Sequence, residues 1–130
     1  MNVFKGLLGG SASLGRTCEE LVPNPLDAPP IRSPQRVHTL LATELFHGKD
    51  IVEIGTRNGD GMGCFALHAR KATAIEYSKP YCISLENRSE ALVRANPGRF
   101  GKDRAYEVAC SDYRTGGVLD ADYITWWERA

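Results

Sequence analysis

The stretch Ile51-Val52-Glu53-Ile54-Gly55-Thr56-Arg57-Asn58-Gly59-Asp60-Gly61 decides the fold of this chain. Its first half is apolar and β-branched apart from one acid, which is typical of a short buried strand. Glycines then crowd the turn, where they permit positive φ and let a ligand lie against the main chain. From about Gly61 to Arg70 the pattern indicates a helix. A strand, a glycine-rich turn and a helix in this order predict a nucleotide-type binding site.

Glu53 separates this stretch from an ordinary phosphate-binding turn. It lies two residues before the first glycine, where a bound phosphate would gain nothing from a negative charge but a cationic ligand would gain a great deal. An isolated acid in this position is also compatible with a partly buried carboxylate satisfied by the backbone. The glycines that follow favour the ligand.

At this point the sequence resembles the class I methyltransferases, which bind S-adenosylmethionine. Their first motif is an apolar strand with an acidic residue and then spaced glycines, and the segment from Val52 to Gly61 follows it. The cofactor carries an α-amino group and a sulfonium, and the resemblance places the Glu53 carboxylate near that charge. Arg57 is either a partner of the cofactor carboxylate or a solvated loop arginine.

The resemblance continues at the ends of two further predicted strands. Lys71 to Ile75 is followed by Glu76-Tyr77, where the family places an acid that accepts both ribose hydroxyls. Ala105 to Cys110 is followed by Ser111-Asp112, where the family has a polar residue facing the adenine amino group. The cofactor-binding residues implied by the resemblance are Glu53, Gly55, Thr56, Arg57, Gly59, Gly61, Glu76, Tyr77, Ser111 and Asp112.

Dinucleotide binding is the main alternative. The segment Gly59-Asp60-Gly61-Met62-Gly63-Cys64 partly mimics the pattern G-x-G-x-x-G, and Glu76 lies near the distance of the ribose-binding acid in that pattern. The last glycine is out of register, with Cys64 in its place. The acid inside the first strand, the glycine spacing and Glu76 together favour S-adenosylmethionine over a nicotinamide or flavin nucleotide.

Strand and helix patterns alternate along the chain. The alternation predicts parallel strands joined by right-handed crossovers, with ligands at their carboxyl ends. The expected fold is α/β, a Rossmann-like methyltransferase fold with a mostly parallel sheet and helices on both faces, truncated after about four strands. The predicted strands are Asp50 to Ile54, Lys71 to Ile75, Ala105 to Cys110 and Asp122 to Trp126.

At 130 residues the chain is short for this family, and it offers the cofactor half without the substrate half. We therefore expect a truncated product or one part of a larger assembly. The fourth strand leaves an apolar edge at 122–127, which we expect a second copy or a completing chain to cover. Asp122 and Tyr123 are the only candidates for a catalytic base, and both also suit structural positions in the strand.

The first third of the chain is organised differently. We expect residues 1–33 to be an N-terminal extension and proline-rich connector, and residues 34–130 to be the S-adenosylmethionine-binding domain. A serine and a proline at 33–34 predict the start of a helix. This helix should pack on the sheet through an apolar stripe and leave two histidines in solvent. The stripe is Val37, Leu40, Leu41, Glu44 and Leu45, and the histidines are His38 and His47.

A second long helix is predicted between Ser78, its cap, and Asn96. Pro80 suits its first turn. Its inward face is predicted to be Tyr81, Ile83, Leu85 and Leu92, and its solvent face Glu86, Arg88, Glu90 and Arg94.

Composition predicts an intracellular globular chain, cytoplasmic or, on a faint N-terminal signal, imported into an organelle. Acidic and basic residues balance at 16 each, so nothing indicates a nucleic-acid partner, and no apolar run is long enough for a membrane. The four cysteines lack C-x-x-C spacing, which predicts reduced, buried thiols and neither a disulfide framework nor a metal site.

Three functions remain open from the sequence. The first is methyl transfer to an unknown acceptor, completed by further sequence or a partner chain. The second is a catalytically silent binding or regulatory half-domain that holds S-adenosylmethionine or merely keeps the fold. The third, less favoured, is a fragment of a nucleotide-dependent oxidoreductase.

Overall fold

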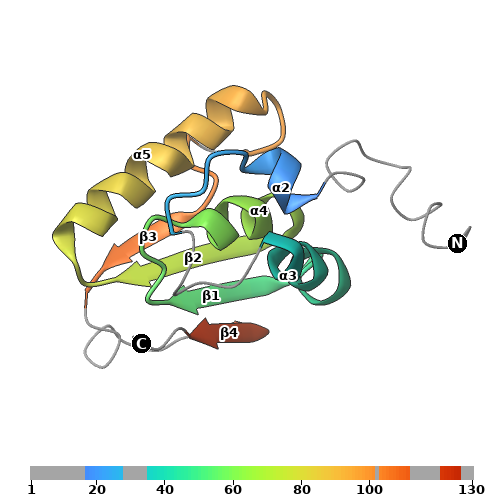
Figure 1. Cartoon of the computed structure of the whole chain (residues 1–130), viewed down its shortest axis with the longest axis horizontal. Helices are drawn as coiled ribbons and strands as arrows, with labels where there is room; N and C mark the ends of the chain where they lie inside the picture. The colour runs from blue at the N-terminus through green and yellow to red at the C-terminus, as the bar shows by residue number, and fades with distance from the viewer. Residues whose placement is uncertain (1–16, 28–34, 102, 112–120, 127–130) are drawn as a thin grey trace, which may run out of the picture.

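A parallel sheet forms the base of the fold (Figure 1). The computed structural model describes residues 17–27, 35–101, 103–111 and 121–126. Within these ranges the sheet has four strands in the order β3-β2-β1-β4, all paired in parallel. The strands are β1 (Asp50–Ile54), β2 (Lys71–Glu76), β3 (Glu107–Cys110) and β4 (Tyr123–Trp126). The predicted α/β fold with a parallel sheet is confirmed, and β1 has the predicted bounds.

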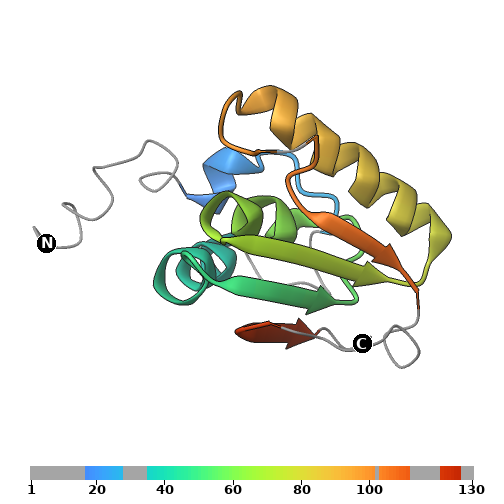
Figure 2. The same cartoon turned by 180° about the vertical axis from the view of Figure 1, so that it is seen from behind.

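The helices form one layer above the sheet, as the two opposite views show (Figures 1 and 2). No helix of the described ranges covers the other face, where the sequence also predicted helices. The helices are α2 (Cys18–Leu21), α3 (Gln35–Leu40), the π-helical turn η1 (Leu41–Leu45), α4 (Asp60–His68) and α5 (Lys79–Ala95).

Helix α4 is the centre of the core. Every one of its residues is buried, because α2, α3, η1 and α5 surround it and β2 lies beneath it. Phe65 on α4 meets Phe46 edge to face, with ring centroids 5.0 Å apart. Such aromatic pairs contribute about 0.5–1.5 kcal/mol beyond the area that they bury. The packing of α4 therefore fixes where the glycine-rich turn before it can lie.

The predicted inward stripe of the first helix is mostly wrong, although Leu41 packs against the core. Val37, Leu40 and Leu45 are exposed, and the buried face is instead His38, Ala42 and Phe46. His38 was predicted to face solvent but is 3% exposed, because its ring packs against Phe65 and its Nδ1 bonds Gln35 Oε1 at 2.7 Å. A polar residue with an internal partner thus takes an inner position beside α4.

The inward face predicted for α5 is also partly wrong. Ile83 is exposed, and the fully buried positions are Cys82, Leu85 and Ser89. Ser89 is buried because its Oγ donates to the carbonyl of Tyr106 and accepts from the backbone N–H groups of Ala105 and Tyr106. This single hydroxyl fastens α5 to the entry of β3.

Two disulfides correct the prediction of reduced thiols. Cys18–Cys64 joins α2 to α4, and Cys82–Cys110 joins α5 to β3. The partners are 46 and 28 residues apart in sequence, and only the tertiary fold brings their Cα atoms to 5.4 and 5.7 Å. Closing loops of these lengths stabilises a fold by roughly 4 kcal/mol each in the chain-entropy account. Disulfides are rare in cytosolic proteins, so the cytoplasmic location stays a prediction that they do not favour.

The segment before α3 packs on the domain. Cys18, Val22 and Asp27 are buried, although the sequence assigned residues 1–33 to an extension and connector. Thr17 caps α2 in a capping box with Glu20. The predicted domain boundary stays a prediction, but residues 17–27 contribute to the core. Among the helices of the described ranges, none combines the length and apolar character needed to cross a membrane.

His68, at the end of α4, makes stability depend on pH. It is buried, and neither ring nitrogen has a hydrogen-bond partner among the described residues. Burial, with smaller effects from His47 and Arg99, lowers the pKa of His68 from 6.5 to about 4. Between pH 6.5 and pH 4, His68 binds a proton in the unfolded chain but stays neutral in the folded chain, so acid favours unfolding.

We predict that the free energy of unfolding falls by up to about 3 kcal/mol between pH 6.5 and pH 4 on account of His68 alone. Urea unfolding of the wild type and His68→Leu across this range measures the difference. His47→Leu removes only one of the smaller causes of the shift, so it should reduce the slope far less than His68→Leu does. An equal slope in His68→Leu would contradict the assignment.

Candidate functional site

The candidate site lies where the parallel strands end. β1, β2 and β3 end at Ile54, Glu76 and Cys110, which share one edge of the sheet. Ligands of open α/β sheets bind outside this edge. The residues from Gly55 to Gly59, here called the glycine loop, run from the end of β1 to the start of α4.

The glycine loop contains three residues with positive φ. Gly55 and Gly59 have φ of 75° and 79°, and Arg57 between them has φ of 57°. An L-residue in the left-handed region costs about 1–2 kcal/mol, so the surroundings must hold Arg57 there. Its backbone N donates to Glu76 Oε1 at 3.2 Å. Its guanidinium lies over the Tyr81 ring, 5.9 Å from the centroid.

Gly59 and Gly61 are required by packing within the protein. A Cβ at Gly59 would lie 2.6 Å from Leu85 Cδ2, and one at Gly61 would lie 3.2 Å from His38 Nε2. Gly61 therefore faces protein side chains inside α4, whereas its predicted role was cofactor binding. Because Gly59 and Gly61 have no side chains, α4 can pack closely against Leu85 of α5 and His38 of α3.

Glu76 joins the glycine loop to the end of β2. Its side chain is 5% exposed; Oε1 accepts from Arg57 N and Oε2 accepts from Tyr77 N at 3.0 Å. Each carboxylate oxygen has a second lone pair, which leaves acceptor capacity for two donors of a ligand. Tyr77 beside it is 62% exposed at this edge.

Glu53 lies under the glycine loop and is only 3% exposed. The Glu53 carboxylate also affects the pKa of Tyr106. Burial is the main cause that raises the pKa of the Tyr106 phenol, Arg88 lowers it, and Glu53 raises it further. The predicted cationic partner of Glu53 would therefore experience its field through the loop rather than as an exposed contact. Thr56 Oγ1 donates to the Glu53 carbonyl at 2.9 Å and closes the turn.

A buried network that the sequence did not reveal supports the loop from the other side. The Asp27 carboxylate accepts from the backbone N of Asn58 at 3.1 Å and from its Nδ2 at 3.0 Å. The Asp60 carboxylate accepts from the backbone N–H groups of Leu26 and Asp27, at 2.9 and 2.7 Å. The segment 22–27 and the loop therefore hold each other in place.

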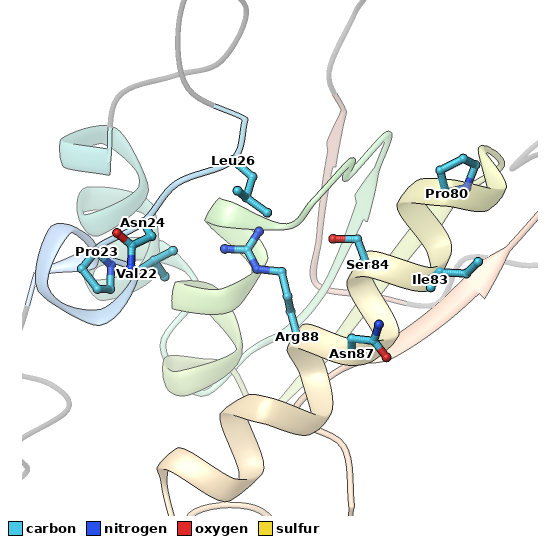
Figure 3. Close-up of a pocket in the computed structure, with 9 residues that line it drawn as sticks. All are labelled: Val22, Pro23, Asn24, Leu26, Pro80, Ile83, Ser84, Asn87 and Arg88. Carbon is cyan, nitrogen blue, oxygen red and sulfur yellow. The ribbon is translucent and has the colours of Figure 1, made fainter.

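Arg88 supplies the cation of this network. It was predicted to stay in solvent, which is wrong: its side chain reaches from α5 toward α4 (Figure 3) and pairs with Asp60 at 3.1 Å. It also donates to the carbonyl of Asn58. The long aliphatic stem lets a residue on the outer part of α5 place its charge over a buried carboxylate.

A groove of about 680 Å³ separates the segment 22–26 from α5 (Figure 3). None of the residues predicted to bind the cofactor lines it. Its walls are Val22, Pro23, Asn24, Leu26, Pro80, Ile83, Ser84, Asn87 and Arg88.

Two solved structures are similar to this chain, and the first of them supports its architecture. PH1948 from Pyrococcus horikoshii, described as a candidate RNA methyltransferase, superposes with a TM-score of 0.55 at 15% identity, over 84% of this chain and 56% of its own. The 23S rRNA methyltransferase ErmE superposes with a TM-score of 0.48 at 19% identity, over 68% of this chain and 32% of its own. No family model and no curated protein matches the sequence.

The chain has the fold of the class I methyltransferases. It spans about half the length of PH1948. In this fold the strand ends, the glycine loop and Glu76 meet at one edge, as the sequence predicted from their order along the chain.

The dinucleotide pattern does not fit this geometry. Gly61 and Gly63 lie inside α4, and Gly59 comes five residues after the end of β1. In the dinucleotide-binding turn the first glycine immediately follows the strand. The similarity to the dinucleotide-binding pattern is therefore confined to the sequence and is not found in the structure.

Two groups of predicted site residues are not gathered at this edge. Asp122 and Tyr123 lie at the amino end of β4, where Asp122 Oδ2 accepts from Asp50 N at 2.8 Å. This is the opposite edge of the methyltransferase-fold sheet. Ser111 follows β3 at the correct edge, and Asp112 lies outside the described residues. Within those residues no cluster of three or more His, Cys, Asp or Glu side chains could hold a metal ion.

We predict that Asp27→Ala lowers the free energy of unfolding by about 1–3 kcal/mol, because it leaves the Asn58 amide without its acceptor. Amide hydrogen exchange should also accelerate at Asn58, whereas the amide of Arg57 keeps its bond to Glu76. Asn24→Ala, an exposed change in the same segment, is the control and should alter neither quantity. Unchanged loop exchange in a folded Asp27→Ala variant would show that the loop holds itself.

Proposed function

We propose that this chain binds S-adenosylmethionine at the carboxyl edge of β1, β2 and β3 and serves methyl transfer. The proposal rests mainly on the position and hydrogen bonds of the Glu76 carboxylate. It lies at the end of β2, it retains acceptor capacity, and it is bonded to the glycine loop of a methyltransferase fold. Two acceptor oxygens match the two vicinal hydroxyls of a ribose.

The charges around the loop support a cationic cofactor over a dinucleotide. Four buried carboxylates, those of Glu53, Glu76, Asp27 and Asp60, surround it, and Arg88 pairs with Asp60. A pyrophosphate would be repelled by this excess of negative charge, whereas a sulfonium and an α-amino group would be attracted. Arg57 is then the side chain available to the cofactor's own carboxylate.

The chemistry supplied by such a cofactor is a methyl group on sulfur, open to in-line displacement by a nucleophile. The proposed contribution of this chain is position: Glu76 holds the ribose, Tyr77 offers its ring to the adenine, and the glycine loop supports the methionine portion. Correct placement of donor and acceptor accounts for several kcal/mol of such a barrier. The loop is already held by Glu76 and Asp27, so binding does not have to order it.

We propose that the acceptor side is supplied by residues outside the described part or by a partner chain. The two residues that the sequence suggested as a base, Asp122 and Tyr123, lie at the other edge. The same observation favours the second candidate, a silent S-adenosylmethionine-binding half-domain. The RNA named for PH1948 is one acceptor to test, although the balanced charge of this chain does not single it out.

We predict that S-adenosylhomocysteine binds and that Glu76→Ala weakens it by about 1.5–3 kcal/mol, roughly 10- to 150-fold in Kd, through the loss of charge-assisted bonds to the ribose. Calorimetric titration measures this, with NAD as the competing ligand. Glu90→Ala, at an exposed position of α5, is the control.

Glu76→Gln retains the loop support in part, because its amide oxygen can still accept from Arg57 N while its NH2 group then faces Tyr77 N. It should weaken the ligand and lower the melting temperature by less than Glu76→Ala does. Tighter binding of NAD than of S-adenosylhomocysteine would refute the proposal. A methyl-release assay on the bound protein then distinguishes the enzyme from the silent half-domain.

We also propose that the outer edge of β4 is covered by a second copy of the chain. Within the described residues β4 pairs only with β1, and Ile124 on it is 47% exposed. An unpaired strand with an exposed apolar side chain is a template for further pairing.

We predict that Ile124→Lys shifts the protein toward the monomer. Size-exclusion chromatography with light scattering gives the mass. Ile83→Lys changes an equally exposed isoleucine on α5 and should leave the mass unchanged. A wild type that is monomeric at every accessible concentration would refute the contact.

A further inference from the structure

The Cys82–Cys110 disulfide lies beside Glu76 at the carboxyl edge of the sheet. The proposed function places the ribose and adenine here, so the ends of β2 and β3 are called the adenosine side. Cys110 is the last residue of β3 and is paired in register with Glu76. Cys82 lies in the first turns of α5, and its Sγ is 3.2 Å from the backbone carbonyl of Glu76. One covalent bond thus joins the strand end before Ser111 to the helix that follows Glu76.

The two disulfides of the chain differ in access to solvent. Cys110 is exposed, whereas Cys18 and Cys64 are 0% and 1% exposed. A thiolate breaks a disulfide by direct attack on sulfur, so access to one sulfur decides which bond exchanges. Attack on Cys110 is open, and Cys82, which is buried, is the leaving sulfur.

We propose that Cys82–Cys110 is a redox-active site that exchanges with dithiols, and that its reduction weakens cofactor binding. The second half of the proposal rests on the proposed function. The first half concerns only this pair and stands independently of it.

The exchange is balanced by a dithiol reductant. Its first thiolate attacks Cys110 Sγ, the Cys82–Cys110 bond breaks, and Cys82 leaves as a thiolate that takes up a proton. The second thiol of the reductant, as the thiolate, then attacks the mixed disulfide and releases Cys110 as a thiol. Two electrons and two protons pass to the protein, and the reductant becomes a cyclic disulfide.

A hydrogen-bond acceptor for the reduced Cys82 thiol is already in place. In the disulfide, Cys82 has no hydrogen to donate, and its sulfur merely touches the Glu76 carbonyl. After reduction the Cys82 thiol can donate to the same oxygen, so the buried sulfur is not left unsatisfied. The end of β3 and Ser111, however, lose their covalent link to α5. The adenosine side becomes looser, and ligand binding must then order it.

Trapping with an alkylating reagent tests the exchange on the full chain. The folded protein is incubated with dithiothreitol, which is then removed at acid pH. The thiols are alkylated with iodoacetamide in denaturant, so that buried ones also react, and are mapped by mass spectrometry. We expect Cys82 and Cys110 to be labelled while Cys18–Cys64 stays intact as the internal control. Reduction of both disulfides together, or of neither before unfolding, would overturn the assignment.

Titration with S-adenosylhomocysteine tests the consequence. The form reduced only at Cys82–Cys110 should bind about 5-fold or more weakly than the oxidised form, the usual scale of coupling between two sites. The double variant Cys82→Ser/Cys110→Ser should match the reduced form and not respond to dithiothreitol. Cys18→Ala/Cys64→Ala should retain the response.

The outcomes separate the two claims. Equal affinity of the oxidised and reduced forms overturns the coupling and leaves the proposed function in place. No binding of S-adenosylhomocysteine to any form overturns the proposed function and the coupling with it. The alkylation map decides the exchange in either case.

Discussion

The architecture depends on one constraint: consecutive backbone N–H groups of the glycine loop are satisfied by carboxylates from distant parts of the chain. Arg57 N bonds Glu76 at the end of β2, and Asn58 N bonds Asp27 in the segment before α3. Both acceptors come from outside the loop, and leaving a buried N–H unpaired costs about 1–3 kcal/mol. The two acids therefore fix both the conformation of the loop and the position of the elements that carry them.

This constraint also shapes the electrostatics of the site. The carboxylates that accept from the loop N–H groups concentrate negative charge beneath the loop. Arg88 on α5 supplies the cation of this network. The cost of burying several acids is offset by their bonds to backbone donors and by this one guanidinium. The resulting field suits a positively charged ligand. Structural support and ligand preference thus arise from the same residues.

Several features were predictable because their cause is local. The strand at Asp50–Ile54, the turn after it and the acid at the end of β2 follow from side-chain type, strand period and glycine spacing. The helix faces were not predictable in the same way. Val37, Leu40 and Leu45 form the apolar stripe, yet His38, Ala42 and Phe46 are buried, because contact with Phe65 and a hydrogen bond to Gln35 decide which face turns inward.

The parallel α/β order and the strand ends at the carboxyl edge could be predicted from the sequence, since both depend on neighbours along the chain. Tertiary structure alone decided the pairing of Cys18 with Cys64 and of Cys82 with Cys110, and the roles of Asp27, Asp60 and Arg88. Their partners lie between 28 and 46 residues away, and no local pattern encodes a contact over that distance. Helix α4 carries Asp60 and Cys64, so its position in the packed fold sets which side chains these two residues can meet.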